Sequence, residues 1–131
     1  MSKIIIAAGP VIVENNQVLL NQHGENDFWK FCGGRTQDDE SLMETASRRA
    51  KEEMGIEIEI INQTPYLMHI TKEIDQEKID VILVHFLAKR IGNIQPGAEI
   101  RQWSWIDITN LDKEALGPNI LPTLEYFHLT A

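Results

Sequence analysis

The sequence lacks the features that would place it among disulfide-bonded or membrane-spanning proteins. Its only cysteine is Cys32, so no disulfide can form within the chain and packing alone must stabilise the fold. A reducing, cytoplasmic location is therefore expected. The apolar run at residues 4–8 is far too short to cross a bilayer, and no convincing cleavage region follows it. The sequence predicts a soluble protein with no membrane partner.

Basic residues are scarce. Twelve lysines and arginines face 20 acidic residues, which gives a net charge of -8. This balance opposes an electrostatic grip on a nucleic-acid backbone, so no nucleic-acid polymer is expected as a partner. If such an acidic chain handles phosphates, it needs cations between its carboxylates and the substrate. At 131 residues and 43% hydrophobic content, residues 1–131 are expected to form a single domain.

Most of the chain shows strand patterns. Two apolar runs, 4–13 and 18–22, are separated by a polar segment suited to a turn, which predicts an opening hairpin. Further strands are expected at 28–31, 56–60, 66–71, 79–88 and 103–106. The charged segment 72–78 is expected to be a connecting loop or hairpin tip. A short C-terminal helix is expected to start near Pro122. This order of elements predicts helices packed on a mixed sheet.

One central helix is predicted over Ser41–Met54. Ser41 and Glu44 have the spacing of a capping box, and Gly55 suits the left-handed position after a helix end. At about 100° per residue, an apolar stripe runs through Ala46 and Ala50 and must pack on the sheet. Glu52 and Glu53 are expected to project toward this buried seam.

Buried carboxylates of this kind need a partner, because desolvating a charge is costly. Glu52 and Glu53 could bracket a cation at the helix edge with oxygen ligands, as Mg²⁺ requires. Taken alone, the two acids also fit a solvated helix face. In that alternative, Arg48 pairs with Glu52 and Arg49 pairs with Glu53 at a spacing of four residues.

The wider pattern favours the cation site. The segment GRTQDDESLMETASRRAKEEMGI resembles the Nudix box, GX5EX7REUXEEXGU, in which U is aliphatic. It matches at Gly34, Glu40, Arg48, Glu52, Glu53, Gly55 and Ile56, and Ala50 serves at one aliphatic position. The preceding WKFCGG resembles the family's aromatic strand before a double glycine, and Trp105 resembles the tryptophan of a late family strand.

The resemblance implies an α/β (α+β) fold, namely an α/β/α sandwich around a mixed sheet with a central catalytic helix. It also implies Mg²⁺-dependent hydrolysis of a nucleoside diphosphate linked to another moiety, with Mn²⁺ as an alternative metal and a small nucleotide as substrate. Glu52, Glu53 and the Gly33 carbonyl would bind the metal. Glu40 and Arg48, with Gly34, would support the site. A homodimer is compatible with the family.

The chain departs from the box at Arg49, where the family has a glutamate that is often a metal ligand or general base. A guanidinium cannot act as a base at neutral pH, and it competes with a cation for Glu53. Either the base comes from elsewhere, with Glu99 as the best substitute, or the domain binds a phosphate ligand without hydrolysing it. Arg49 and Arg35 are the candidates for substrate binding.

Two other candidate residues precede the box. Of the four histidines, only His23 lies in a loop that could reach the pocket. Cys32 is expected to be a buried small residue and not a nucleophile, since nothing nearby would lower its pKa.

Overall fold

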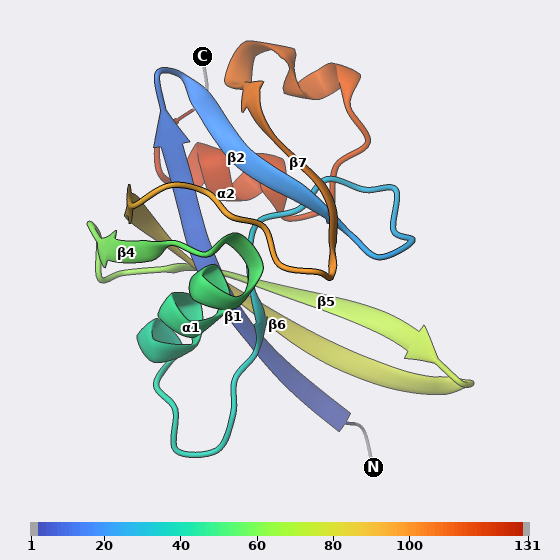
Figure 1. Cartoon of the computed structure of the whole chain (residues 1–131). Coiled ribbons are helices and arrows are strands. Elements are labelled where there is room, and N and C mark those ends of the chain that lie inside the picture. Colours follow the sequence, from blue (N-terminus) through green and yellow to red (C-terminus); the bar gives the residue numbers. More distant parts are fainter. Residues whose placement is uncertain (1–2, 130–131) are drawn as a thin grey trace.

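The computed structural model describes residues 3–129, and its centre is a mixed sheet with a helix on each face (Figure 1). The sheet has seven strands in the order β4-β6-β1-β2-β7, with β3 added to β1 and β5 added to β6. The elements are β1 Lys3–Glu14, β2 Gln17–His23, β3 Gly34–Arg35, α1 Leu42–Met54, β4 Glu57–Ile60, β5 Tyr66–Ile74, β6 Glu77–Ile91, β7 Ile100–Asp107, the 3₁₀ helix η1 Ile108–Lys113 and α2 Ile120–Tyr126.

Strand β1 holds the sheet together. It pairs in parallel with β6 from Lys3 to Ile12, and it turns into β2 through Asn15 and Asn16, which both have positive φ. The predicted opening hairpin is therefore confirmed, and its turn is of the tight kind that asparagine tolerates. Because β2 continues into pairing with β7, β1 joins the long β5–β6 hairpin to the β2–β7 pair (Figure 1).

Neighbouring residues of β1 face opposite layers. Val11 is buried in a cluster with Leu124 of α2, whereas Ile12 is buried in a cluster with Met54 of α1. Successive side chains of a strand point to opposite faces, so a strand with apolar residues at consecutive positions must be covered on both sides. The predicted α/β/α sandwich around a mixed sheet is confirmed.

The helix α1 has both of its predicted ends. The Ser41 side chain accepts from the backbone N–H of Glu44 at 3.1 Å, and the Glu44 carboxylate accepts from that of Ser41 at 2.8 Å. Gly55 adopts φ 67 and ends the helix. Ala46, Ala50 and Met54 are buried against the sheet, as the apolar stripe predicted.

Other boundaries differ from the prediction. Residues 28–31 do not form a strand; they make isolated bridges with Asn21 and Leu116, and the next strand is the two-residue β3. Neither bridge extends into a ladder, so the segment has no continuous partner strand. The segment 72–78 forms a hairpin tip, which was one of the two expected outcomes. Only Asp75 and Gln76 form the turn, and the other residues of the segment are paired, exposed ends of β5 and β6.

Two further elements begin earlier than expected, and one was not foreseen. β7 starts at Ile100 and α2 at Ile120, and η1 has no sequence prediction behind it. Within residues 3–129, no helix combines the length and apolar character needed to span a bilayer.

Candidate functional site

The candidate site lies where the last turn of α1 meets the glycine pair and the 92–99 loop. The loop is fastened to the helix end, because Gln95 N–H donates to the Met54 carbonyl at 2.7 Å and Gly97 N–H donates to the Glu53 carbonyl at 2.9 Å. A side chain at Gly97 would meet the Glu52 carbonyl oxygen at 2.5 Å. The close approach that glycine permits brings Glu99 to the end of the helix.

The end of β2 delivers His23 to the same place. The β2–β7 register shifts between Gln22 and His23, and Gly24 N–H donates to the Glu99 carbonyl at 3.1 Å. A bulge of this kind re-aims the side chain beside it. His23 Nε2 lies 3.2 Å from Glu99 Oε2 and 4.0 Å from Glu53 Oε2. One ligand atom from each of the three residues lies within 4.8 Å of the others.

Glu53 is the buried acid of the site, with no exposed surface. Its Oε1 accepts from Gly33 N–H at 2.7 Å, while its Oε2 has no hydrogen-bond partner among the described residues. Arg49 Nη2 lies 3.1 Å from this Oε2, which is close enough for an ion pair without being aligned as a hydrogen bond. Burial raises the pKa of Glu53, and the charge of Lys30 and the Gly33 N–H oppose the rise.

Arg49 touches every group that was predicted to bind metal or act as the base. Its Nε donates to the Gly33 carbonyl at 3.3 Å and its Nη1 to Glu52 Oε1 at 3.0 Å. Its Nη2 lies 3.1 Å from Glu53 and 3.6 Å from Glu99. The guanidinium therefore supplies positive charge among these oxygens, and a side chain on Gly34 would overlap it.

Glu52 does not point into the buried seam, so that part of the sequence prediction was wrong. Its side chain is 45% exposed and also accepts from Arg48 Nη1 at 2.7 Å. One helix position separates it from Glu53, and a rotation of about 100° turns it to the open edge. Both ion pairs of the solvated-face alternative are present, although Glu53 itself is buried.

The predicted supporting pair joins the 35–40 loop to the helix. Arg48 Nε donates to Glu40 Oε2 at 2.7 Å and its Nη2 to Glu40 Oε1 at 3.1 Å, and it also reaches the Arg35 carbonyl at 2.8 Å. The Thr45 hydroxyl donates to Glu40 at 2.7 Å. The Arg48 guanidinium, followed by the Thr45 hydroxyl, lowers the pKa of Glu40 to about 2. Glu40 is thus an anchoring anion, which is the role expected for it.

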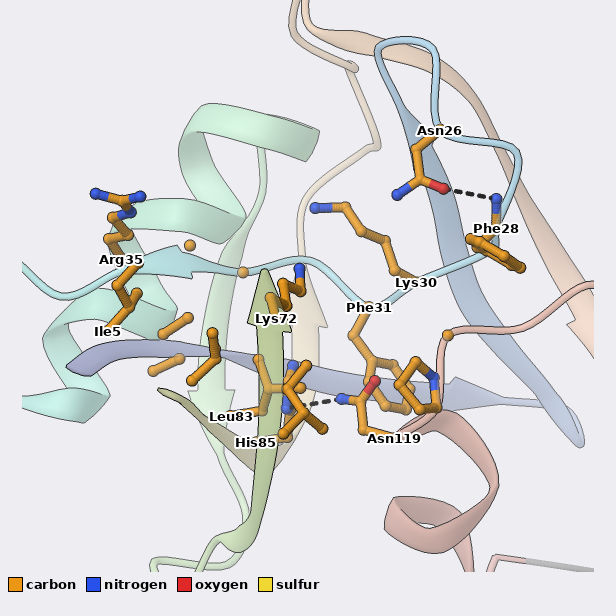
Figure 2. A pocket seen from close by; sticks show the side chains of 18 of the residues that line it. Ile5, Asn26, Phe28, Lys30, Phe31, Arg35, Lys72, Leu83, His85 and Asn119 are labelled. Carbon is orange, nitrogen blue, oxygen red and sulfur yellow. Dashed lines mark hydrogen bonds between the residues drawn. The ribbon is translucent and has the colours of Figure 1, made fainter. Parts of the chain in front are cut away.

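Two cavities of about 490 and 580 Å³ adjoin the site and share Lys30, Gly33, Gly34 and Arg35 in their walls. Figure 2 shows the 490 Å³ cavity, with the cationic ends of Lys30, Arg35 and Lys72 in the upper part of the view and His85 and Asn119 below them. Burial, with the charge of Lys30, lowers the pKa of His85 to about 3, so its ring is neutral. The cavity of Figure 2 thus combines a cationic end with a neutral, partly apolar one.

The structure adds two residues to those predicted as site residues. His23 lies beside Glu53 and Glu99. Its only sequence signal was its place in a loop before the glycine pair. Lys30 lines both cavities; a lysine between two aromatic residues just before that pair could have marked it. Cys32 is buried as predicted, and burial raises the pKa of its thiol to about 12.

Comparisons with known proteins agree with this architecture. The *Saccharomyces cerevisiae* m7GpppN-mRNA hydrolase is 27% identical over 125 residues, which cover 90% of this chain and 12% of the yeast protein. The *Escherichia coli* ORF135 protein is 25% identical with a TM-score of 0.71, covering 97% of this chain and 90% of that one. A NUDIX hydrolase from *Nitrosomonas europaea* is 16% identical with a TM-score of 0.80, covering 96% and 89%.

A *Caenorhabditis elegans* Ap4A hydrolase is similar in fold, with 21% identity and a TM-score of 0.72 over 95% of each chain. The chain spans about an eighth of the length of the yeast relative. The family model described as NUDIX domain matches residues 4–127, which include the helix, the glycine pair and Glu99. The chain therefore belongs to the Nudix hydrolase family.

Proposed function

We propose that this domain, residues 1–131, hydrolyses a phosphoanhydride bond in a nucleoside diphosphate linked to another moiety, with Mg²⁺ as its metal. The observation that carries the proposal is Glu53, a fully buried carboxylate with one oxygen lacking a hydrogen bond, placed beside two cavities with cationic walls. An isolated buried carboxylate is costly, and a bound cation would offset that cost.

The residues present fit a divalent cation. Glu53 Oε2 has no hydrogen-bond partner among the described residues and lies in one cluster with the Glu99 carboxylate, and Mg²⁺ takes oxygen ligands. Glu53, Glu52 and the Gly33 carbonyl would hold it, in competition with the guanidinium of Arg49. When bound, the metal neutralises pyrophosphate charge and lowers the pKa of a water molecule.

The side chains of this domain supply the remaining functions. Lys30 and Arg35 form no ion pair with another described residue, and both line the cavities, so they are free to bind phosphate oxygens. Glu99 is 44% exposed, and its carboxylate can take the proton of the attacking water. Arg48 and Glu40 hold the loop against the helix, which keeps Arg35 at the cavity wall.

The relatives suggest which substrates to test. The yeast protein is named for hydrolysis of an mRNA cap and the *C. elegans* protein for hydrolysis of Ap4A. The net charge of -8 disfavours a long polyanion, so a small nucleotide is proposed here. A capped RNA oligonucleotide belongs in the substrate panel because it tests that preference directly.

The decisive experiment measures phosphate or pyrophosphate release from nucleoside triphosphates, diphosphate conjugates and capped RNA, with and without Mg²⁺. Glu53→Gln should lower turnover by about 100-fold or more. Glu44→Gln, on the same helix, should stay within about twofold because glutamine also serves the capping box. Metal-independent turnover, or full activity in Glu53→Gln, would refute the proposal.

One observation favours a second function. Arg49 contacts the Gly33 carbonyl and the carboxylates of Glu52, Glu53 and Glu99. In this alternative the domain binds a phosphate ligand and does not hydrolyse it. Arg49→Glu separates the two functions. If the wild type shows no Mg²⁺-dependent turnover and the variant gains it, the binding function is correct; turnover by the wild type supports the enzyme.

A further inference from the structure

We infer that His23, Glu53 and Glu99 form a second cation site with an imidazole ligand, selective for a first-row transition metal such as Mn²⁺ over Mg²⁺. This His23 site shares Glu53 with the proposed Mg²⁺ site and uses His23 and Glu99 in place of Glu52 and the Gly33 carbonyl. The inference rests on the proposed function to the extent that both place a divalent ion against Glu53.

The distances suit a single ion. Metal–ligand bonds of about 2.0–2.2 Å place neighbouring donor atoms roughly 3.0–3.5 Å apart. His23 Nε2 lies 3.2 Å from Glu99 Oε2 and 4.0 Å from Glu53 Oε2, and one ligand atom from each residue lies within 4.8 Å of the others. Reaching this spacing needs a contraction of up to about 1.3 Å (4.8 less 3.5 Å), which the part-exposed side chains of His23 and Glu99 can provide by moving toward the buried Glu53.

Glu53 supplies an independent indication of a ligand. It is fully buried, and its two oxygens differ, because Oε1 accepts from Gly33 N–H and Oε2 has no hydrogen-bond partner among the described residues. The unsatisfied oxygen is the one that faces His23. Such an oxygen costs free energy unless a cation or donor reaches it.

Arg49 favours the His23 side over the opposite one. Its guanidinium hydrogen-bonds the Gly33 carbonyl and Glu52, which are ligands of the proposed Mg²⁺ site. On the His23 side, Arg49 forms ion pairs with Glu53 and Glu99, at 3.1 and 3.6 Å, but no aligned hydrogen bond with either. Glu99 also turns its other oxygen, Oε2, away toward His23. An ion there would replace one hydrogen bond, between His23 Nε2 and Glu99 Oε2 at 3.2 Å, and would leave the two hydrogen bonds of Arg49 in place.

The backbone holds His23 and Glu99 together before any ion arrives. The bulge at Gln22–His23 aims the imidazole, and the Gly24–Glu99 backbone hydrogen bond of 3.1 Å joins the two loops. His23 is 35% exposed and Glu99 44% exposed, so an ion can enter from solvent while Glu53 forms the buried end. Such preorganisation lowers the ordering cost of binding.

The imidazole sets the metal preference. Mg²⁺ takes oxygen ligands and keeps several waters, whereas Mn²⁺, Co²⁺ and Zn²⁺ accept an imidazole nitrogen. His23 binds through Nε2 only as the neutral ring with its proton on Nδ1. Loss of His23 should therefore weaken transition-metal binding much more than Mg²⁺ binding.

The test measures Mn²⁺ and Mg²⁺ binding by calorimetry without nucleotide, together with ¹⁴N coupling to bound Mn²⁺ by pulsed electron paramagnetic resonance. His23→Gln is compared with His69→Gln, which removes the exposed histidine that pairs with Asp80 at 2.8 Å. We expect the wild type and His69→Gln to show imidazole ¹⁴N coupling. His23→Gln should lose it, with Mn²⁺ affinity reduced by about tenfold or more and Mg²⁺ affinity within about threefold.

Absence of ¹⁴N coupling in the wild type, or its persistence in His23→Gln, would overturn the inference. The wild-type spectrum decides the matter even if the variant misfolds. Hydrolysis is assayed separately with Mg²⁺ alone. Turnover without ¹⁴N coupling refutes only the His23 site, and ¹⁴N coupling without turnover refutes only the proposed hydrolysis.

Discussion

Nη2 of Arg49 lies 3.1 Å from Oε2 of Glu53, one helical turn further along α1. At the position of Arg49 the Nudix box has a glutamate, so this chain carries a fixed positive charge where the family pattern has a carboxylate. Two positive charges in one acidic cluster repel each other at short range. Arg49 is therefore expected to weaken the proposed Mg²⁺ binding at Glu53 even though it helps to stabilise the buried carboxylate.

Replacing Arg49 with glutamate should tighten Mg²⁺ binding by about tenfold or more, which corresponds to roughly 1.4 kcal/mol. The reason is that the competing cation leaves and an oxygen ligand takes its place. Calorimetric titration of both proteins with Mg²⁺ measures the change.

Lys51→Glu is the matched control, because it makes the same charge change on the same helix at a side chain that is 60% exposed. It should change Mg²⁺ affinity by less than about threefold, since exposed charges are screened. An equal gain in both variants would mean that net charge, and not Arg49, governs the affinity.

Helix α1 was predictable because its signals are local. Ser41, Glu44 and Gly55 specify its ends through contacts three or four residues apart, and the apolar period specifies its buried face. Glu53 follows from the same rotation. The outward turn of Glu52 follows from it too, because adjacent helix positions differ by about 100° and two neighbouring acids cannot both face the sheet. The prediction placed both acids on the buried side and was wrong for Glu52.

His23 was harder to predict because its place depends on non-local geometry. A register shift between β2 and β7 and a backbone bond to Glu99, 75 residues further on from Gly24, bring it to Glu53. Nothing in the spacing of the histidines shows this. The strand predicted at residues 28–31 was wrong for a related reason. Such a segment forms a strand only where a neighbouring strand pairs with it along its length, and here only isolated bridges form.

Gly9→Ala should destabilise the fold by about 3 kcal/mol, because the new Cβ would overlap the Cys32 carbonyl where β1 passes beneath the glycine pair. Backbone atoms block the site, so no side-chain rotation can relieve the overlap. Gly117→Ala is the control, since its Cβ would meet atoms only at 3.5 Å or beyond. Urea unfolding should show a loss in Gly9→Ala and a change within about 1 kcal/mol in Gly117→Ala. Equal losses would contradict this explanation.

Glu40 should confer acid sensitivity in a defined range. Its pKa is lowered from 4.5 to about 2, chiefly by Arg48, so the folded state holds fewer protons than the unfolded state between these values. The stabilisation by Glu40 is therefore complete above pH 4.5 and is lost as the pH falls toward 2.

The measurement is the difference in urea midpoint between the wild type and Glu40→Gln across this pH range. The difference should be largest at neutral pH and shrink below pH 4.5. Glu73→Gln, at an exposed carboxylate of β5 that forms no ion pair with another described residue, should show no such trend. A constant difference for Glu40→Gln would mean that its carboxylate charge is not what joins the loop to the helix.

His85 should also confer acid sensitivity, in a higher pH range than Glu40. Burial and Lys30 lower its pKa from 6.5 to about 3, so on acidification the unfolded chain takes up the proton first. The free energy of unfolding should fall by about 1.4 kcal/mol per pH unit below pH 6.5 as a result. The range from pH 6.5 to 5 lies above that of Glu40, so the two effects can be separated. In His85→Leu the slope should be lost between pH 7 and 5, and wild-type stability that does not change over this range would show that the imidazole is not held neutral.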